Sequence, residues 1–258
     1  MTAPKLLILG NSHTAASRVA LRDDPERWPG FCPDVFAMPG ETLADLDLQD
    51  GALHPPNAEI AQKMRFYNQT DRFSLTGYDA FVLIGGLSVN AVSALQDRHR
   101  SVDFPSVAAG QDCCLVSSGL IDALIADRIE ASPALRILRK LAGLSARPVL
   151  FIDQVLPSSD CRDDPQRFAG YVAMVARGDG MAFRDRYLRV LHRVLGGDAI
   201  HLPQPAQTIA DGVFSAPEWM RGSVRMNPRR DVLHEVAEHG HANAAYGALQ
   251  VDQILRAL

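Results

Sequence analysis

Short apolar segments that end in turn residues constrain the fold of this chain more than any other feature of its sequence. Four of them cover residues 5–9, 34–38, 80–84 and 149–152, and a fifth, less apolar one covers residues 199–202. Each is a continuous apolar run rather than an alternating one, which is typical of parallel strands that helices cover on both faces. Turn residues such as Gly10, Pro39 and Gly85 mark the ends of the runs. We therefore predict a central parallel sheet built from these five segments.

The segments between the predicted strands carry a helical pattern. Apolar residues recur at spacings of three and four in residues 120–129, 135–144, 183–195 and 242–258. Strands that alternate with helices predict a doubly wound α/β fold, and we expect one domain over residues 1–258. Two stretches do not fit the minimal fold and are expected to be long insertions, at about 87–119 and 204–230. Long loops of this kind often bind ligands or cover a site.

The charge of the chain is close to balanced. Its 258 residues include 26 Lys and Arg and 30 Asp and Glu, which gives a formal net charge of −4. Nucleic-acid-binding proteins usually have a concentrated basic face, so we expect no nucleic-acid partner. Arg229 and Arg230 form the one unusual basic pair, and a solvated loop is the more ordinary explanation for it.

No segment of the sequence predicts a membrane span or a secretory signal. The chain has no run of about 18 apolar residues, and the run at 5–9 is short for the apolar part of a signal peptide. The four cysteines are irregularly spaced, and the adjacent Cys113 and Cys114 are poor disulfide partners for each other. Reduced thiols are typical of the cytosol, so we expect a cytoplasmic protein that binds no membrane.

The loops after the first three predicted strands are rich in glycine and polar residues. Ser12 follows the first strand, Gly40 follows the second, and Gly86, Ser88 and Asn90 follow the third. In open parallel sheets the ligand crevice lies at the carboxyl ends of the strands, where the strand order reverses. With the order 2-1-3-4-5 this reversal falls between the first and third strands. Ser12 and Gly86 would then flank the crevice.

Ser12 lies between a strand and an expected helix, on a tight turn that suits a nucleophile. Backbone N–H groups at the start of a helix also stabilise a developing negative charge. The ordinary alternative is that Ser12 or Thr14 caps the helix that follows. The neighbouring His13 could line the pocket or supply a hydrogen-bond donor, and the ordinary alternative is a partly buried, hydrogen-bonded loop histidine.

Three histidines and three carboxylates in residues 231–241 offer a base for Ser12. His234 and His239 are five residues apart, which puts them on different faces of a helix and misses the spacing of the helical zinc motifs. We therefore expect no metal site. Two carboxylate–histidine pairs at a spacing of three remain, Asp231 with His234 and Glu238 with His241.

Four segments spread along the chain share a further pattern. They are L-I-L-G-N-S-H at 7–13, A-M-P-G-E-T-L-A-D-L at 37–46, V-L-I-G-G-L-S at 82–88 and H-A-N-A-A-Y-G at 241–247. In this order they resemble the four blocks of the SGNH (GDSL-type) hydrolase superfamily. Its members are esterases and acyl-hydrolases on a flavodoxin-like three-layer α/β sandwich. The resemblance implies Ser12 as the nucleophile, His241 as the base and Gly40 as a backbone donor to the oxyanion.

The chain departs from the family pattern at three positions. Asn11 stands where the family has Asp, and Glu238 replaces the Asp three residues before the histidine. A glutamate can still accept a hydrogen bond from the imidazole and hold its tautomer. Ser88 stands where the family has an oxyanion-binding Asn, and Asn90 lies two positions further on. Either side chain is the candidate donor, or the donor is absent, which would cost a factor of about 10²–10³ in rate.

His241 is the preferred base, because A-N-A-A-Y-G follows it as in the last family block, whereas E-V-A follows His234. The resemblance then implies a serine esterase or acyl-hydrolase that acts on a small or carbohydrate ester through an acyl-enzyme, without a cofactor. An acyltransferase with the same site and a non-catalytic domain that binds a saccharide or another ligand are the alternatives. A nucleotide-binding domain is disfavoured, because neither G-x-G-x-x-G nor a P-loop motif occurs at the first loop.

Overall fold

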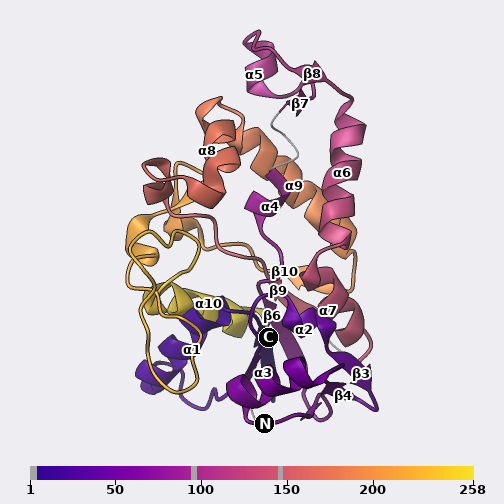
Figure 1. Ribbon diagram of the computed structural model, residues 1–258, viewed down its shortest axis with the longest axis vertical. Coiled ribbons are helices and arrows are strands. Elements are labelled where there is room, and N and C mark those ends of the chain that lie inside the picture. The colour runs from indigo at the N-terminus through magenta and orange to yellow at the C-terminus, as the bar shows by residue number, and fades with distance from the viewer. Residues whose placement is uncertain (1–4, 94–97, 145–147) are drawn as a thin grey trace.

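The computed structural model describes residues 5–93, 98–144 and 148–258 of the chain (Figure 1). Five parallel strands form its central sheet, in the order β10-β9-β6-β1-β2. Their bounds are β1 Leu6–Gly10, β2 Asp34–Ala37, β6 Ala80–Ile84, β9 Val149–Ile152 and β10 Ala199–His201. Counted along the chain, this is the order 2-1-3-4-5. The predicted parallel sheet is confirmed, with strand ends that differ from the expected ones by at most one residue.

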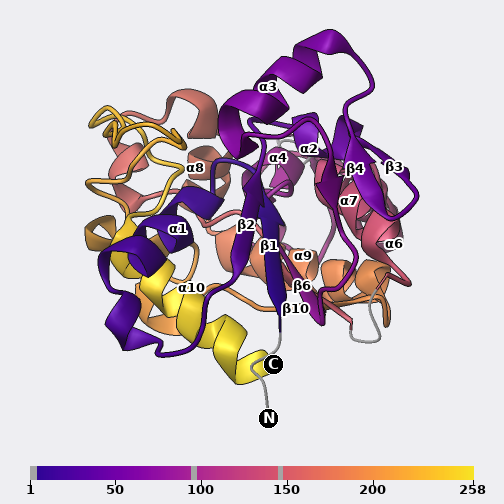
Figure 2. The same ribbon diagram turned by 90° about the horizontal axis from the view of Figure 1, so that it is seen from below.

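Helices cover both faces of this sheet (Figure 2). Successive side chains of a strand point to opposite faces, so Leu6 and Ile8 join one core while Leu7 and Leu9 join the other. The helices on the first face are α1 (Thr14–Asp23) and α10 (Ala244–Ala257). The helices that contribute to the larger core on the second face include α2 (Thr42–Asp45), α3 (Ala58–Asn68), α6 (Ser118–Glu130), α7 (Pro133–Leu141) and α9 (Gly180–Leu195).

The four predicted helices correspond to α6, α7, α9 and α10, with starts that differ from the expected ones by two or three residues and ends that differ by at most three. Polar caps set three of the starts. The side chains of Ser117, Ser132 and Asn243 each accept a hydrogen bond from the backbone N–H three residues later. A cap satisfies one of the otherwise unpaired donors of the first turn, so the helix begins directly after it.

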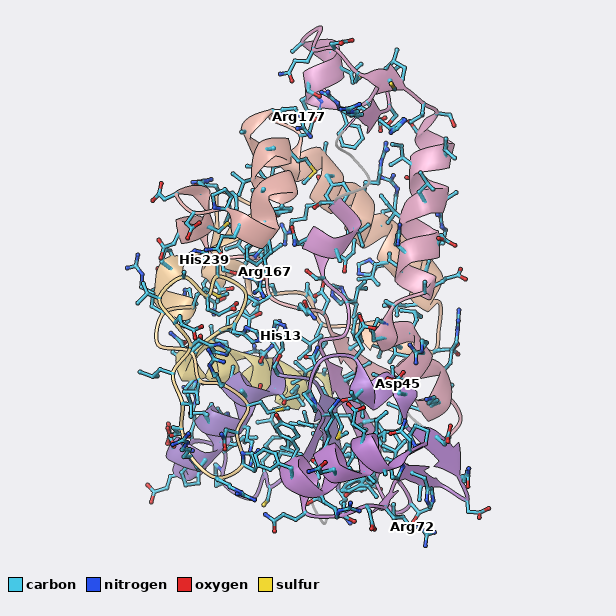
Figure 3. All side chains as sticks on the ribbon, viewed as in Figure 1. His13, Asp45, Arg72, Arg167, Arg177 and His239 are labelled. Atoms are coloured by element: carbon cyan, nitrogen blue, oxygen red, sulfur yellow. The ribbon has the colours of Figure 1, made fainter. Side chains whose placement is uncertain are left out.

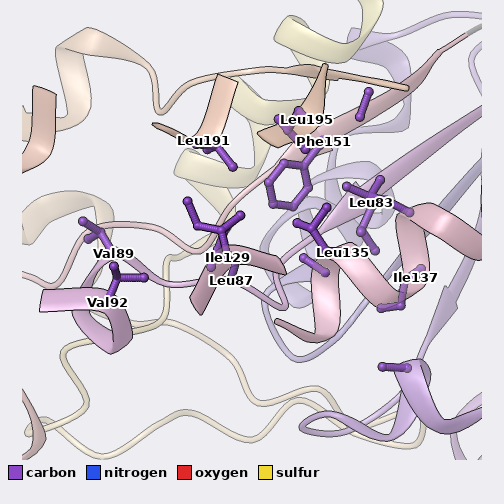
Figure 4. Close-up of a cluster of buried hydrophobic side chains, with 14 of the residues drawn as sticks. Leu83, Leu87, Val89, Val92, Ile129, Leu135, Ile137, Phe151, Leu191 and Leu195 are labelled. Atoms are coloured by element: carbon purple, nitrogen blue, oxygen red, sulfur yellow. The ribbon is translucent and has the colours of Figure 1, made fainter. Parts of the chain in front are cut away.

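The segment expected as the first insertion carries its own short elements above the carboxyl ends of the strands (Figure 1). These are α4 (Val89–Ser93), β7 (His99–Arg100), α5 (Pro105–Ala108) and β8 (Cys114–Leu115), with α8 (Ala169–Ala176) nearby. Val89 and Val92 belong to the same buried cluster as Leu83 and Phe151 of the sheet (Figure 4). The elements above the sheet thus share a continuous hydrophobic core with it.

The remaining strands are short and lie outside the central sheet. β3 (Asp47–Gln49), β4 (Ala52–His54) and β5 (Phe73–Ser74) form an antiparallel sheet, and β11 (Ile209–Ala210) pairs with β12 (Phe214–Ser215). The second expected insertion contains this last pair and is otherwise largely irregular. In the part of the chain that the structure describes, no helix combines the length and apolarity that a membrane crossing requires.

The two helices on the first face, α1 and α10, approach each other closely. Gly247 lies against the backbone of α1, where an added Cβ would come within 2.1 Å of the carbonyl oxygen of Ala16. Beside this contact the Ser17 hydroxyl donates a buried hydrogen bond of 2.8 Å to Gln250 Oε1. Only a residue without a side chain allows the helices to pack at this distance.

Substitution of Gly247 by Ala is expected to destabilise the fold, because the new methyl group must push α10 away from α1. Overpacking of this kind costs about 1–3 kcal/mol, which in a chain of this length lowers the melting temperature by several degrees. Thermal unfolding followed by circular dichroism would measure the change. Gly170→Ala in α8 is the matched control, since nothing lies within 4 Å of its added Cβ. Equal melting temperatures for the two variants would contradict the close contact.

Candidate active site

The loops that follow β1, β2 and β6 meet at the carboxyl edge of the sheet and line a pocket with a volume of about 550 Å³. The lining includes all the residues that the sequence placed in these loops, together with the preferred base: Ser12, His13, Gly40, Gly86, Ser88, Asn90 and His241. His13 lies between the sheet below and the helices above, with Arg167 close to it (Figure 3). The reversal of strand order between β1 and β6 creates this crevice.

Ser12 is not a helix cap. The N-cap position of α1 is His13, whose side chain makes no capping bond, while the Thr14 hydroxyl donates to the Asn11 carbonyl oxygen at 2.8 Å. The Asn11 side chain accepts from the His13 N–H at 3.2 Å and so supports the turn from within. The Ser12 hydroxyl is left to face the pocket, and its Oγ lies 2.9 Å from His241 Nε2.

Glu238 lies on the other side of the His241 ring. Its Oε1 is 3.1 Å from His241 Nδ1, but out of line for a straight hydrogen bond. The same oxygen accepts from the Gly240 N–H at 2.7 Å and from Arg167 Nη2 at 2.5 Å. Burial raises the pKa of the Glu238 carboxyl, but its contacts with His241, Gly240 and Arg167 outweigh that effect and lower the pKa to about 2. Glu238 is therefore a carboxylate at neutral pH.

His241 is the middle ring of a stack of three imidazoles. Its centroid lies 4.5 Å from that of His13, with 12° between the ring planes, and 4.4 Å from that of His234, with 17° between the planes. Burial, followed by the charge of His241, lowers the pKa of His13 well below its ordinary value. The same two causes, in the same order, lower the pKa of His234 to about 4. The two outer rings are therefore neutral at pH 7.

Asp231 and His234, the alternative carboxylate–histidine pair, do not meet in the structure. Both carboxylate oxygens of Asp231 accept from the guanidinium of Arg22, at 2.8 Å each. His234 instead covers one face of His241, and its Nε2 is buried without a hydrogen-bond partner among the described residues. Of the two carboxylate–histidine pairs, only Glu238 and His241 are therefore in contact.

The candidate oxyanion donors surround Ser12. Gly40 has a positive φ of 57°, and within the described residues the backbone N–H groups of Ser12 and Gly40 donate to no other group. The Ser88 hydroxyl oxygen accepts from the Asn90 N–H at 3.2 Å, and the Asn90 side chain donates to the Arg167 carbonyl oxygen at 3.4 Å. The two side chains are therefore held by local contacts at the pocket wall.

Several pocket residues were not anticipated from the sequence. Arg128 at the end of α6, Gln154 after β9, and Arg167 and Phe168 before α8 all line the pocket. Of these, Gln154 has a signal in the sequence, because it stands just beyond the carboxyl end of a predicted strand. Arg167 contacts Glu238 across 71 residues of sequence, and no local pattern predicts such a contact.

Two histidines and one carboxylate lie close enough together to be considered as metal ligands. Ligand atoms of His234, Glu238 and His241 lie within 4.8 Å of one another. The two rings are stacked face to face, however, and their nitrogen lone pairs lie in nearly parallel planes. Ligands of a metal ion must converge on one point. The rings would have to turn out of the stack, and His241 away from Ser12, before they could bind an ion.

No protein-family model, curated protein or solved structure matches this chain. In this chain a hydroxyl, an imidazole and a carboxylate follow one another in space, with free backbone donors beside the hydroxyl. The hydroxyl and the imidazole line the pocket.

The buried histidines make the stability of the protein dependent on pH. The pKa of His234 is about 4 in the folded chain and about 6.5 when unfolded, so between these values the unfolded chain binds more protons. Stability is therefore fully present above about pH 6.5 and decreases as the pH falls toward 4. Melting temperatures measured across this range should fall, and His234→Phe should reduce the fall because it removes one of the titrating rings. A variant with an unchanged pH dependence would contradict the burial of a neutral His234.

Proposed function

We propose that this protein is a serine ester hydrolase of SGNH-like type, with Ser12 as nucleophile, His241 as base and Glu238 as the carboxylate behind the base. The observation that carries the proposal is the 2.9 Å contact between Ser12 Oγ and His241 Nε2. A serine hydroxyl needs an adjacent base to become a nucleophile, and the base needs a partner that orients it. The strand order 2-1-3-4-5 and the resemblance of four segments to the SGNH blocks support the same assignment.

The proposed reaction has two steps. Ser12 Oγ attacks the ester carbonyl while His241 Nε2 takes its proton, and the tetrahedral oxyanion accepts hydrogen bonds from the N–H groups of Ser12 and Gly40. Collapse of this intermediate breaks the ester C–O bond, and His241 returns the proton to the leaving alcohol. A water molecule then attacks the acyl-enzyme with His241 again as base, which releases the acid and restores Ser12. Ser88 and Asn90 are the candidates for a third oxyanion donor.

The imidazole stack compensates for the poor alignment of Glu238. A carboxylate out of line with Nδ1 stabilises the charge of an imidazolium but fixes the direction of the ring only loosely. His13 and His234 hold the plane of His241 by contact with both faces. Because their pKa values are lowered, both outer rings are neutral, and their π faces favour a positive charge that forms between them during the reaction.

The pocket fits a small substrate. A volume of about 550 Å³ is in the range of small-molecule sites, and its walls combine apolar side chains such as Val92 and Phe168 with polar ones such as Gln154 and Arg128. A small or carbohydrate ester matches this lining. Transfer of the acyl group to a sugar hydroxyl would use the same residues, with the hydroxyl in place of the water.

Labelling with a fluorophosphonate probe tests the nucleophile directly, because the probe reacts with activated serines. The wild type should be labelled and should hydrolyse p-nitrophenyl acetate, whereas Ser12→Ala should do neither. Ser74→Ala is the matched control, since Ser74 is exposed in β5 and its hydroxyl bonds only Thr76 and its backbone. A wild-type protein that is neither labelled nor active would overturn the proposal in favour of a non-catalytic binding domain.

Three further variants distinguish the two carboxylate–histidine pairs. His241→Ala should abolish hydrolysis, and Glu238→Gln should lower kcat at least about 10-fold, because a neutral amide no longer stabilises the imidazolium. Asp231→Asn should leave kcat within about 2-fold, since Asp231 bonds Arg22 and not the base. If Asp231→Asn were the more damaging change, the base would be His234.

The stack is tested by variants that keep or remove a flat ring. Replacing His13 or His234 by Ala should lower kcat about 10-fold or more below the corresponding Phe variant, with a smaller change in KM, because only Ala lets the His241 ring turn. Initial rates with p-nitrophenyl acetate at pH 7.5 would give both constants. If His13→Phe is as impaired as His13→Ala, the ring of His13 acts as a hydrogen-bond donor instead of a packing surface.

A further inference from the structure

A second cavity is lined by residues of α1 and of the irregular segment 224–231. Its volume is about 400 Å³, and it shares no lining residue with the pocket at Ser12. Five arginines line it: Arg18, Arg22, Arg225, Arg229 and Arg230. Asp231 is the one carboxylate among the described lining residues. The cavity therefore carries a strong excess of positive charge in a chain whose net charge is −4.

Two of these arginines are neutralised by carboxylates. Arg22 bonds both oxygens of Asp231 at 2.8 Å and also contacts Asp23, while Arg225 pairs with Glu235. These ion pairs hold the wall of the cavity in place and leave the other three arginines unpaired among the described residues. The bidentate bond between Arg22 and Asp231 also ties the loop segment to α1.

The other three arginines, Arg18, Arg229 and Arg230, have no carboxylate within ion-pair distance in the described parts of the chain. Arg18 is half-buried on α1, where solvent screens its charge less than at an exposed position. The guanidinium of Arg229 rests over the ring of Phe66, 5.0 Å from its centroid, which restricts its motion. These three guanidinium groups are therefore available to an anion that enters the cavity.

Apart from Asn227, the rest of the lining is apolar. Ala15 and Val19 come from α1, and Val224, Met226 and Pro228 come from the segment across the cavity. A ligand that fills this space must combine an anionic group for the arginines with a carbon framework for these side chains. The volume of the cavity matches a small molecule and not a polymer.

We propose that this cavity binds a small organic phosphate. The guanidinium fork matches the oxygens of a phosphate, and a phosphate monoester carries three acceptor oxygens and nearly two negative charges, which suits three unpaired arginines. A single carboxylate would be satisfied by one arginine and would leave the other two unpaired. The phosphate group pairs with Arg18, Arg229 and Arg230, and the organic part packs on the apolar side chains. This proposal is independent of ester hydrolysis at Ser12.

Calorimetric titration of the full chain with phenyl phosphate, at low salt, tests the site. Phenyl phosphate should bind saturably, more tightly than inorganic phosphate or benzoate, and less tightly as the salt rises to about 0.3 M. Both Arg18→Gln and the double variant Arg229→Gln/Arg230→Gln should weaken binding about 10-fold or more. Thermal unfolding of each variant checks that the substitutions leave the fold intact.

Arg193→Gln is the matched control. Arg193 is exposed in the last turn of α9 and, like Arg230, has no carboxylate within ion-pair distance in the described residues. Its substitution should leave the affinity for phenyl phosphate within about 2-fold. The proposal would be overturned by absent or non-saturable binding, by an equal effect of Arg193→Gln, or by unchanged affinity in the arginine variants. Equal affinity for inorganic phosphate would overturn the assignment of an organic ligand.

Discussion

The close packing of α1 against α10 is the contact on which the candidate active site depends. α1 begins two residues after Ser12, and α10 begins three residues after His241, although the two side chains are 229 positions apart. The approach at Gly247 sets how far the starts of the two helices lie from each other. Asn243 adds a second constraint, since it caps α10 and also donates to the carbonyl oxygens of Glu218 and Arg221. The hydroxyl and the imidazole are thus brought together by helix packing and capping.

Burial and nearby charges at the pocket then determine which side chains of the site are charged. His13 and His234 lose their protons because a buried imidazolium beside another positive ring is costly, whereas Glu238 stays charged because three donors surround one of its oxygens. The result is that His241 lies between two neutral rings, with a carboxylate beside it. A histidine held in this way next to a hydroxyl is the arrangement that the proposed general base catalysis requires.

The sequence predicted the sheet well because continuous apolar runs bounded by glycine and proline have few other solutions in a chain of this size. It did not predict α3, because only Ile60 and Met64 of that helix are buried and two apolar residues make a sparse pattern. The loop residues around Ser12 followed from the strand order, since the carboxyl ends of neighbouring parallel strands must meet. The stacking of His234 on His241 could not be predicted in this way. Both residues lie in an irregular segment whose path is set by contacts distant in sequence.

That segment, 224–243, is held mainly by single contacts rather than by a helix or a sheet. Three of its contacts are ion pairs, Arg22–Asp231, Arg225–Glu235 and Arg167–Glu238. The first two are exposed, and exposed ion pairs contribute only about 0–1 kcal/mol each. The buried contacts are stronger constraints: the His239 carbonyl oxygen accepts from the Ser158 N–H at 2.8 Å, and two rings enclose His241. Raised salt should therefore loosen the arginine-lined end of the segment well before it displaces the base, because screening weakens charges at the surface and leaves ring packing intact.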